Sequence, residues 1–297
     1  MDRPKFVIEP TEAESMANQL GLTVLELLPS LVKPAQSLAR PPISKYHVGA
    51  VGLGSSGRIF LGVNLEFPGL PLHHSVHAEQ FLVTNLYLNA ESNLRYVAVS
   101  SAPCGHCRQF FQEIRGASDI NVLVTSDEPN EDRSKFRPLS YFLPHRFGPD
   151  DLLDKDEPLL LEPHRNGLSL LGAKENCCSE LCNGDTFAEE LKRAALDAAN
   201  RSHAPYSRCP SGVALIDCEG KVYKGSYLES AAYNPSFGPV QAAIVDYVAN
   251  GFGGGYERIV GAVLVEKEDS VVRQEHTARL ILQLISPKCT FKVFHCC

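Results

Sequence analysis

Hydrophobic and polar positions near the start of the chain follow a helical period. Leucine and valine residues recur through residues 11–40, and threonine–glutamate capping boxes begin at Thr11 and Thr23, with Gly21 between them. Such boxes satisfy the free N–H groups of a first helical turn, and glycine is typical just past a helix end. The pattern therefore predicts two helices, which form an N-terminal helical extension over residues 1–40.

The following segment changes to the period of strands. Two apolar runs flank a Gly-Ser-Ser-Gly turn, which predicts a β-hairpin. Beyond it, helical and strand patterns alternate, as is typical of an α/β fold with helices packed on a sheet. The elements predicted here are strands at 48–53 and 58–65, a helix at 80–88, a strand at 94–101, a helix that begins near Pro103, and a strand at 121–125.

The second half of the chain repeats the pattern of the first. A further capping box at Thr186 opens a helix whose apolar face includes Phe187 and Leu191. An internal repeat of this length indicates a duplicated fold. The similar segments are 44–49 with 207–212, 62–66 with 225–229, and 76–79 with 240–243.

Composition shifts place the boundaries between the predicted domains. Prolines and charges become frequent after the first set of elements, which is typical of a linker. We expect the N-terminal extension to be followed by a catalytic core at 41–153, a linker at 154–183 and a second core at 184–297.

Charge and cysteine content restrict the class of protein. The net charge is −7, which argues against a surface built for a polyphosphate backbone. We find neither an apolar run long enough to span a membrane nor a secretory signal at the N-terminus. Ten cysteines without regular spacing favour a reducing compartment, and cytosol is the expected location.

Two short motifs in the first core carry the candidate chemistry. His77-Ala78-Glu79 reads H-x-E, and Pro103 to Cys107 reads P-C-x-x-C. In this order they form the established signature of zinc-dependent nucleobase deaminases. A catalytic zinc site keeps three protein ligands and one open position, and His77, Cys104 and Cys107 supply three. Glu79 is then left as the acid/base.

The spacing within the motifs fits this division of roles. Residues two apart on a regular helix point away from each other, so His77 and Glu79 can converge only at an irregular first turn. Cys104 and Cys107 are three apart, on one face of the helix expected to begin at Pro103. Arg108 could offset the two thiolates from the second coordination shell.

Two alternatives to a catalytic zinc site remain at this point. A closed structural site needs a fourth ligand, and His106 is available between the cysteines. The second alternative is a metal-free cluster of buried cysteine and histidine. In the aligned repeat His77 becomes Gln241 and Glu79 becomes Ala243, with no P-C-x-x-C after them, so the second core is predicted to lack the chemistry.

Two further groups of polar residues could bind ligands. Asn64 and Glu66 share one face of a strand and suit a pair of sugar hydroxyls, or they are simply a solvent-facing strand end. Cys177, Cys178 and Cys182 could bind a second metal. Because no matching ligand pair stands nearby, ordinary thiols are the favoured interpretation of these three.

Together these residues resemble the cytidine deaminase family, and in particular its larger dimeric branch of bacteria and plants. The resemblance extends over nearly the whole chain, including the degenerate second core. It implies a three-layer α-β-α sandwich, duplicated, with the N-terminal helical extension. The most specific segments are His77–Glu79, Pro103–Gln109, Asn64 with Glu66, and Phe147–Leu152.

The resemblance also implies roles for residues around the motifs. In the family, the residue matching Tyr46 stacks on the pyrimidine, and those matching Asn64 and Glu66 bind the ribose 3′-hydroxyl. The backbone N–H matching Ala78 meets the carbonyl oxygen of the base. Ala102 departs from the threonine that is common in the family, with little expected effect because a backbone carbonyl acts there.

The activity implied is zinc-dependent hydrolytic deamination of cytidine and deoxycytidine to uridine and deoxyuridine in pyrimidine salvage. Water activated by Zn²⁺ attacks C4, and Glu79 carries protons to N3 and to the leaving amine. The implied assembly is a homodimer in which the second core completes the active site of the partner, with residues 227–239 as the candidate contact. Neither a nucleic acid nor a membrane is expected as a partner.

Three competing functions share parts of these observations. A polynucleotide deaminase would use the same zinc chemistry, but the negative charge and the lack of an aromatic-basic tract count against it. A nucleotide or a pterin-like base is another candidate substrate, although no basic cluster stands near Asn64 in the sequence. The third is a non-enzymatic, zinc-organised scaffold.

Overall fold

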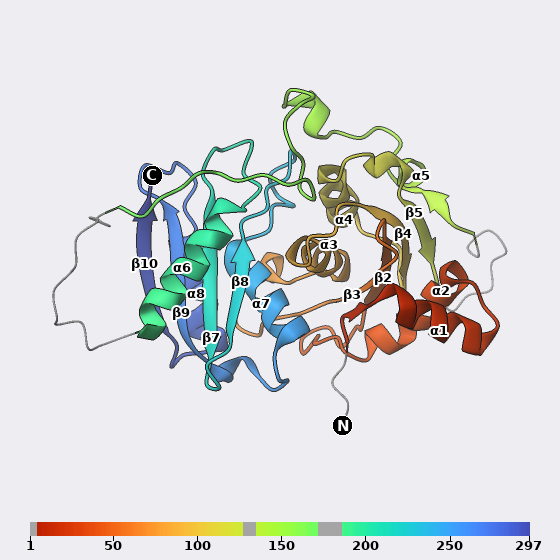
Figure 1. Ribbon diagram of the computed structural model, residues 1–297, viewed down its shortest axis with the longest axis horizontal. Coiled ribbons are helices and arrows are strands. Elements are labelled where there is room, and N and C mark those ends of the chain that lie inside the picture. Colours follow the sequence, from red (N-terminus) through yellow and green to blue (C-terminus); the bar gives the residue numbers. More distant parts are fainter. Residues whose placement is uncertain (1–4, 127–134, 172–185) are drawn as a thin grey trace. The chain divides into compact units, whose positions relative to one another are not determined.

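The computed structural model describes residues 5–126, 135–171 and 186–297 (Figure 1). These residues divide into two compact units. Unit 1 comprises residues 1–163 together with 229–236, and unit 2 comprises residues 164–228 and 237–297. The segment 229–236 therefore comes from the second half of the sequence but belongs to the unit formed by the first half.

Unit 1 contains a mixed sheet of six strands in the order β1-β3-β2-β4-β5-β6. Strands β2 and β3 form the predicted hairpin, β2 is antiparallel to β4, and β4 is parallel to β5. The elements of this unit are β1 (Val7–Ile8), α1 (Pro10–Leu20), α2 (Val24–Gln36), β2 (Gly49–Gly54), β3 (Ile59–Val63), α3 (Ala78–Leu88), β4 (Leu94–Val99), α4 (Gly105–Phe110), β5 (Asn121–Val124), β6 (Arg137–Pro138) and α5 (Leu139–Phe142).

Unit 2 contains four strands in the order β10-β9-β7-β8. Strand β7 is antiparallel to both neighbours, and β9 is parallel to β10, so the central pairings repeat those of unit 1. Its elements are α6 (Thr186–Asn200), β7 (Ser211–Asp217), β8 (Val222–Ser226), α7 (Pro239–Asn250), β9 (Ile259–Lys267), α8 (Glu275–Ile285) and β10 (Thr290–Cys296).

Glycines let a helix approach each face of the unit 1 sheet. A Cβ on Gly49 would meet the backbone of α2, at 2.7 Å from the oxygen of Val32. A Cβ on Gly62, which points to the opposite face, would lie 2.2 Å from the carbonyl oxygen of Ala78 in α3. The sheet is thus sandwiched between α2 and α3, and the predicted three-layer α-β-α fold is confirmed.

Unit 2 has the same layers. Gly212 faces α6 as Gly49 faces α2, and Gly225 faces α7 as Gly62 faces α3. Because the duplicated positions are glycines in both units, the close approach of helix to sheet is the feature that the repeat preserves. The apolar core between α6 and its sheet includes Leu191, Ala195, Ala199, Ala214, Val263 and Val265.

Helix α2 starts at the predicted position, and helix α1 does not. Helix α2 begins with the predicted capping box, in which the hydroxyl of Thr23 accepts from the N–H of Glu26 at 3.2 Å. Helix α1, however, begins at Pro10 with Glu9 as its N-cap, so the predicted box at Thr11 is wrong. Proline needs no N–H partner at the first helical position, which allows this earlier start. Helix α6 begins at Thr186; the side chains of its first three residues, Phe187 among them, lie outside the description.

The structure corrects the alignment of the repeat at the start of α7. Leu65 pairs with Val76 just before His77 caps α3, and Leu228 pairs with Phe237 just before Gly238 caps α7. His77 is therefore equivalent to Gly238 rather than to Gln241.

The error is three residues, close to one helical turn, so the apolar face looked the same in both registers. By the same correction Glu79 is equivalent to Val240, and not to Ala243. The conclusion is unchanged, because neither Gly238 nor Val240 offers a ligand or a carboxylate.

The segment predicted as a linker, residues 154–183, is built into both units over its described part. The N–H of Leu160 donates to the carbonyl of Glu113 at 3.0 Å in unit 1. The N–H of Asn166 donates to the carbonyl of Asn200 at 2.8 Å in unit 2, and Leu170 bridges to Cys296. The boundary falls between Pro163 and His164.

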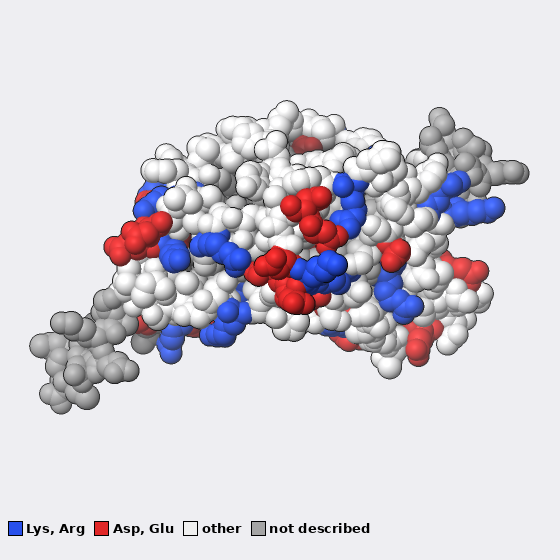
Figure 2. All heavy atoms as spheres, turned by 90° about the horizontal axis from the view of Figure 1, so that it is seen from above, with Lys and Arg blue, Asp and Glu red and all other residues white. Residues whose placement is uncertain are grey.

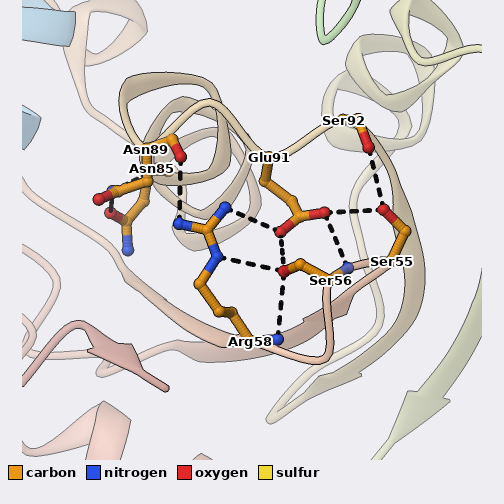
Figure 3. Close-up of polar contacts among 7 residues, drawn as sticks. All are labelled: Ser55, Ser56, Arg58, Asn85, Asn89, Glu91 and Ser92. Carbon is orange, nitrogen blue, oxygen red and sulfur yellow. Dashed lines mark hydrogen bonds and ion pairs between the residues drawn. The ribbon is translucent and has the colours of Figure 1, made fainter. Parts of the chain in front are cut away.

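A buried carboxylate holds the β2–β3 turn against the end of α3 (Figure 3). Glu91 accepts from the hydroxyl of Ser55 at 2.8 Å and from the N–H of Ser56 at 3.2 Å, and it pairs with Arg58 at 3.1 Å. Arg58 also donates to the carbonyl of Asn89 at 3.1 Å. Burial raises the pKa of Glu91, but the hydrogen bonds from Ser56 and Ser55 and the Arg58 charge outweigh it and lower the pKa.

Unit 2 fixes the equivalent turn with a different residue. Gly54 leaves room for the Glu91 carboxylate, since a Cβ there would lie 2.5 Å from it. The equivalent of Gly54 is Asp217, whose own carboxylate accepts from the N–H groups of Glu219 and Lys221 and from the Tyr223 hydroxyl. Both hairpins are thus tied by one buried acidic group, supplied from different positions.

We expect Glu91→Gln to lower the free energy of unfolding by about 3 kcal/mol, because it leaves the Arg58 guanidinium without its buried partner. The pKa of Glu91 is lowered in the folded state, so its stabilisation is complete above the unfolded pKa of about 4.3 and is lost as the pH falls through the folded value. Denaturant unfolding measures this effect. The free energies of unfolding of wild type and variant should differ strongly at pH 7 and less at pH 3.

Glu12→Gln is the matched control, since the Lys5–Glu12 pair is exposed and such pairs contribute about 0–1 kcal/mol. If Glu91→Gln and Glu12→Gln lowered the free energy of unfolding equally at pH 7, a structural role for Glu91 would be contradicted.

Candidate active site

Two helix N-termini bring the motif residues together. His77 is the N-cap of α3 and Cys104 is the N-cap of α4, so both side chains lie beside a first helical turn. Cys107 is the third residue of α4, where an N-cap side chain folds back over the turn. Helix α4 begins at Gly105, two residues after the predicted start at Pro103. This later start makes Cys104 a cap and explains how the two cysteines converge.

The three donor atoms form a compact triangle. Nδ1 of His77 lies 3.5 Å from Sγ of Cys104 and 3.3 Å from Sγ of Cys107, and the two sulfur atoms are 3.6 Å apart. Tetrahedral zinc, with Zn–S near 2.3 Å and Zn–N near 2.0–2.1 Å, places its donors about 3.5–3.8 Å apart. The triangle therefore fits a zinc ion in both donor type and size.

The group has three protein donors rather than four. Among the residues that the structure describes, the cluster able to hold a metal ion is His77, Cys104 and Cys107. His106, the candidate fourth ligand of a closed site, instead places Nε2 at 3.1 Å from the side-chain amide of Gln80. The arrangement thus favours an open site.

Hydrogen bonds among the donors set their pKa values. The hydrogen bond between Cys104 and Cys107 and the contact with His77 outweigh the effect of burial and lower the pKa of Cys104 to about 3. The same bond and burial raise the pKa of Cys107. The bond to Cys104 raises the pKa of His77. Cys104 is therefore a thiolate at neutral pH, and this charge favours a cation at the centre of the triangle.

Glu79 lies in the first turn of α3, beside the three donors. Its side chain is 5% exposed, and Oε2 is 3.3 Å from Sγ of Cys107. Burial raises the pKa of this carboxyl group. A carboxyl group whose pKa is moved toward neutrality, close to a metal site, is suited to accept and return protons.

Arg108 supports the motif through the backbone. Its Nε donates to the carbonyl of Pro103 at 2.6 Å and its Nη1 to the carbonyl of Phe142 at 3.0 Å. The guanidinium also lies over the Phe142 ring, 5.9 Å from its centroid. These bonds go to carbonyl groups rather than to the thiols, so Arg108 fixes the chain that leads into Cys104.

A cavity of about 470 Å³ opens in front of the donors. It brings together the residues that the sequence singled out, because Tyr46, Asn64, Glu66, Ala78 and Glu79 all line it with His77 and Cys104. The lining residues that the sequence analysis missed are Ile43, Ser44, Val48, Leu72, Ser75, Val76 and Ser101. Ser44, Val48 and Val76 lie in segments that belong to the internal repeat, but no sequence pattern assigns any of the seven residues to a cavity.

Asn64 and Glu66 are not a solvent-facing strand end. The amide of Asn64 accepts from the N–H of Val48 at 2.8 Å and donates to the carbonyl of Tyr46 at 2.9 Å. Glu66 accepts from the N–H groups of Ile43 and Ser44 at 2.9 and 2.8 Å. Both side chains thus hold the loop that carries Tyr46.

Glu66 keeps its charge in this setting. Burial raises its pKa, but the hydrogen bonds from the Ser44 hydroxyl and backbone outweigh that effect, and the pKa is lowered. An ionised carboxylate has about four lone-pair sites and Glu66 uses three of them within the loop. One acceptor position therefore remains for a hydroxyl in the cavity.

Tyr46 stands at the mouth of the cavity. Its side chain is exposed, and its hydroxyl lies 2.7 Å from the hydroxyl of Ser101. The preceding Lys45 has φ of 58°, in the left-handed region that is uncommon for residues other than glycine. The hydrogen bonds that the loop makes with Asn64 and Glu66 hold it in place, so the ring position depends on both.

Unit 2 has no counterpart of the donor set at the equivalent helix starts. Gly238 caps α7 and Gln274 caps α8, in place of His77 and Cys104. Cys177, Cys178 and Cys182 lie outside the described residues. No helix in the described part of the chain is long and apolar enough to cross a membrane.

The family described as "Cytidine and deoxycytidylate deaminase zinc-binding region" matches residues 139–279 and, separately, residues 23–124. The protein named "Cytidine deaminase 1" of Arabidopsis thaliana is 68% identical over 305 residues, covering 100% of this chain and 99% of that protein. The chain belongs to the cytidine deaminase family. The match over residues 23–124 lies within unit 1, and its zinc-binding description agrees with the His77, Cys104 and Cys107 triangle. The match over residues 139–279 begins in unit 1 and extends through most of unit 2.

A second relative is similar over the full length, and a solved structure is similar over part of the chain. "Cytidine deaminase 7" of Arabidopsis thaliana is 54% identical, covering 99% of this chain and 95% of that protein. A crystal structure of cytidine deaminase from Mycobacterium tuberculosis is 29% identical, with a TM-score of 0.36, and covers 41% of this chain and 96% of that chain.

We expect the purified protein to contain about one tightly bound zinc per chain, because unit 1 presents three ligands and unit 2 none at the equivalent positions. Elemental analysis after dialysis checks this, with Cys104→Ser as the variant that should lose most of the metal. A stoichiometry of two would point to a second site, which the cysteines at 177, 178 and 182 could form.

Proposed function

We propose that this chain converts cytidine and deoxycytidine to uridine and deoxyuridine by zinc-dependent hydrolytic deamination, as part of pyrimidine salvage. The observation that carries the proposal is the juxtaposition of the His77, Cys104 and Cys107 triangle with buried Glu79 at the end of one cavity. Two thiol sulfurs, one imidazole and a separate carboxyl group are the set that this chemistry needs. Membership of the cytidine deaminase family supports the same substrate class.

His77, Cys104 and Cys107 would hold the zinc ion. When bound, zinc lowers the pKa of a coordinated water and so supplies a nucleophile at neutral pH. Glu79 accepts the proton of that water and delivers it to N3 of the base, which makes C4 electrophilic. The hydroxide oxygen bonds to C4. Glu79 then takes the remaining proton of that new hydroxyl group and gives it to the 4-amino group, which leaves as ammonia when the C4–N4 bond breaks. Its burial beside Cys107 suits this double role, because it raises the pKa of the carboxyl group toward that of the groups it serves.

The rest of the cavity would position the nucleoside. The N–H of Ala78, in the first turn of α3, is the proposed donor to the carbonyl oxygen of the base. Tyr46 would stack on the pyrimidine, and Asn64 and Glu66 would bind the 3′-hydroxyl of the sugar. The remaining acceptor position of Glu66 and its retained charge support this last role.

A phosphorylated nucleoside is the second candidate substrate, for one reason. A cavity of about 460 Å³ adjoins the first, shares Tyr46, Ser101 and Ala102 with it, and is also lined by Lys135 and Arg137. Two cations beside the nucleoside cavity could meet a phosphate group.

A polynucleotide is disfavoured by the surface charge. In Figure 2, acidic and basic side chains of the described residues are interspersed on the face that is drawn. The net charge of −7 acts against a polyanion as well.

Glu79→Gln should retain zinc and lose about 10²–10⁴-fold in kcat, because the amide cannot carry the proton. The assay follows ammonia release from cytidine, deoxycytidine, cytosine and cytidine monophosphate, with zinc measured on the same samples. Release from the two nucleosides alone supports the proposal, and faster release from the monophosphate favours the second candidate. Near-normal turnover by the zinc-loaded variant would remove Glu79 from its proposed role.

The sugar assignment is tested on the wild-type enzyme, which avoids disturbing the Tyr46 loop. Removal of the 3′-hydroxyl should lower kcat/KM by about 10–100-fold, since a hydrogen bond to a charged group contributes about 1.5–3 kcal/mol. The comparison is 3′-deoxycytidine against cytidine, with 2′-deoxycytidine as the matched control that should stay close to cytidine. Equal kcat/KM for the 3′-deoxy compound would rule out the proposed contact.

We further propose a homodimer in which the second core of one chain completes the active site of the other. The candidate contact, residues 227–239, includes a segment that belongs to unit 1 of its own chain, where Ser230 and Ala231 are buried. The portion left for a partner is its exposed tip. There Tyr233 is 68% exposed with φ of 61°, a backbone conformation that an aromatic residue adopts only under constraint.

Mixed subunits test this assembly. Sedimentation should give about twice the chain mass of 32.5 kDa. Tyr233→Ala and Glu79→Gln should each be weakly active alone, and mixing them should restore activity, because a Glu79→Gln chain supplies an intact Tyr233 to the site of its Tyr233→Ala partner. A Glu79→Gln homodimer mixed with wild type serves as the exchange control. No gain on mixing, with exchange shown, would mean that Tyr233 does not act across the dimer.

For location we propose the cytosol. All seven cysteines in the described parts of the chain are free thiols, which suits a reducing compartment.

A further inference from the structure

Gln80, the residue after the H-x-E motif, contacts three different parts of unit 1. Its Oε1 accepts from the backbone N–H of His77 at 3.3 Å. Its Nε2 lies 3.1 Å from Nε2 of His106 and 3.3 Å from the carbonyl oxygen of Pro235. The side chain is buried, so it meets protein groups rather than water.

These partners fix the orientation of the amide. A backbone N–H can only donate, so it must face the oxygen of Gln80, and a backbone carbonyl can only accept, so it must face the nitrogen. The NH₂ group has two hydrogens, and Pro235 and His106 take both of them. The amide therefore has one orientation, and His106 accepts through Nε2.

Both histidines held by Gln80 belong to the metal centre. His77 is a proposed ligand, and His106 lies between the two cysteines of the second motif. The rings of His77 and His106 are 5.4 Å apart at an interplanar angle of 33°, so each limits the tilt of the other. Gln80 thus restrains the His77 ring in two ways, through its backbone and through the neighbouring imidazole.

The third partner, Pro235, belongs to the segment 229–236, which the second half of the chain contributes to unit 1. This segment is anchored independently of Gln80, because the N–H of Ala231 donates to Oε1 of Glu113 at 2.8 Å. Glu113 is fully buried. Within the segment, the N–H of Ser230 donates to the hydroxyl of Ser236 at 3.0 Å, which closes it into a compact loop.

We propose that Gln80 is a positioning residue that links the metal centre to residues 229–236, so that a segment of the repeat without ligands holds His77 in place. Glu113 sets the position of the segment, the carbonyl of Pro235 and His106 orient the Gln80 amide, and Gln80 orients His77. The proposal rests on the proposed zinc ligands, and it concerns metal retention rather than turnover.

The test uses full-length protein and measures the rate of zinc release to a chelator, with the visible spectrum of the Co²⁺-loaded protein as a second readout. Gln80→Met keeps the volume of the side chain but removes all three contacts. Partners that orient metal ligands typically contribute about 10–100-fold to metal affinity, so zinc release should be at least about tenfold faster and the ligand-field bands should shift. Gln112→Met is the matched control, because Gln112 is equally buried but donates to the carbonyl of Arg108, and its release rate should match wild type.

The role of residues 229–236 is tested by changing Glu113, which accepts the hydrogen bond from Ala231. Glu113→Met removes the acceptor for Ala231 and should also speed zinc release, while Glu113→Gln keeps an acceptor oxygen and should restore a slow rate. In the double variant Gln80→Met/Glu113→Met, the combined effect should be smaller than the product of the two single effects, because both act through one chain of contacts. If Gln80→Met does not fold, the zinc-release rates of Glu113→Met and Glu113→Gln test the proposal on their own.

Several results would overturn the proposal. Wild-type zinc release and an unchanged Co²⁺ spectrum for Gln80→Met would do so, as would single effects that multiply independently in the double variant. No rescue by Glu113→Gln would also count against it. A wild-type protein that binds no zinc would instead contradict the proposed function, so the two failures are distinguishable.

Discussion

The structure of the site depends on two helices that begin at the same place. His77 and Cys104 are the N-caps of α3 and α4, so the start of a helix sets the backbone position of each donor. The close approach of α3 to the sheet, which Gly62 permits, sets where the first of these turns lies. Glu79 then falls beside Cys107 because it occupies the second position of the same helix. The start of α3 therefore places His77 and Glu79, and the start of α4 places Cys104 and Cys107.

Much of this could be predicted from the sequence, because the relevant signals are local. The hairpin turn, the Thr23 capping box and the donor set each depend on a few neighbouring residues. The rest depends on contacts between residues far apart. Glu91 belongs to no motif, yet it holds the β2–β3 turn. Ser44 lines the cavity and donates to Glu66, which lies 22 positions along the chain. The wrong register at Gln241 has the same origin, since only the strand pairing before α7 distinguishes one helical turn from the next.

The two units show which constraints duplication keeps and which it releases. Glycines that admit a helix to each face of the sheet remain in both, because a side chain there would displace a whole helix. The buried acid that ties the hairpin also remains, although Asp217 supplies it locally and Glu91 from the end of a helix. The donor positions are free to change, and Gly238 and Gln274 now occupy them. In the unit without the donor set, the glycine positions that packing requires are kept, and the positions that metal binding would require are not.

This difference bears on why the second half is retained. If the second half served only its own stability, its residues would need to make contacts only within unit 2. Residues 229–236 instead belong to unit 1, where Ala231 contacts Glu113 and Pro235 contacts Gln80. In the first repeat, the equivalent loop after Glu66 lines the nucleoside cavity through Leu72 and Ser75. The loop after β3 in one copy and the loop after β8 in the other therefore both belong to unit 1, where the first lines the cavity and the second contacts Gln80.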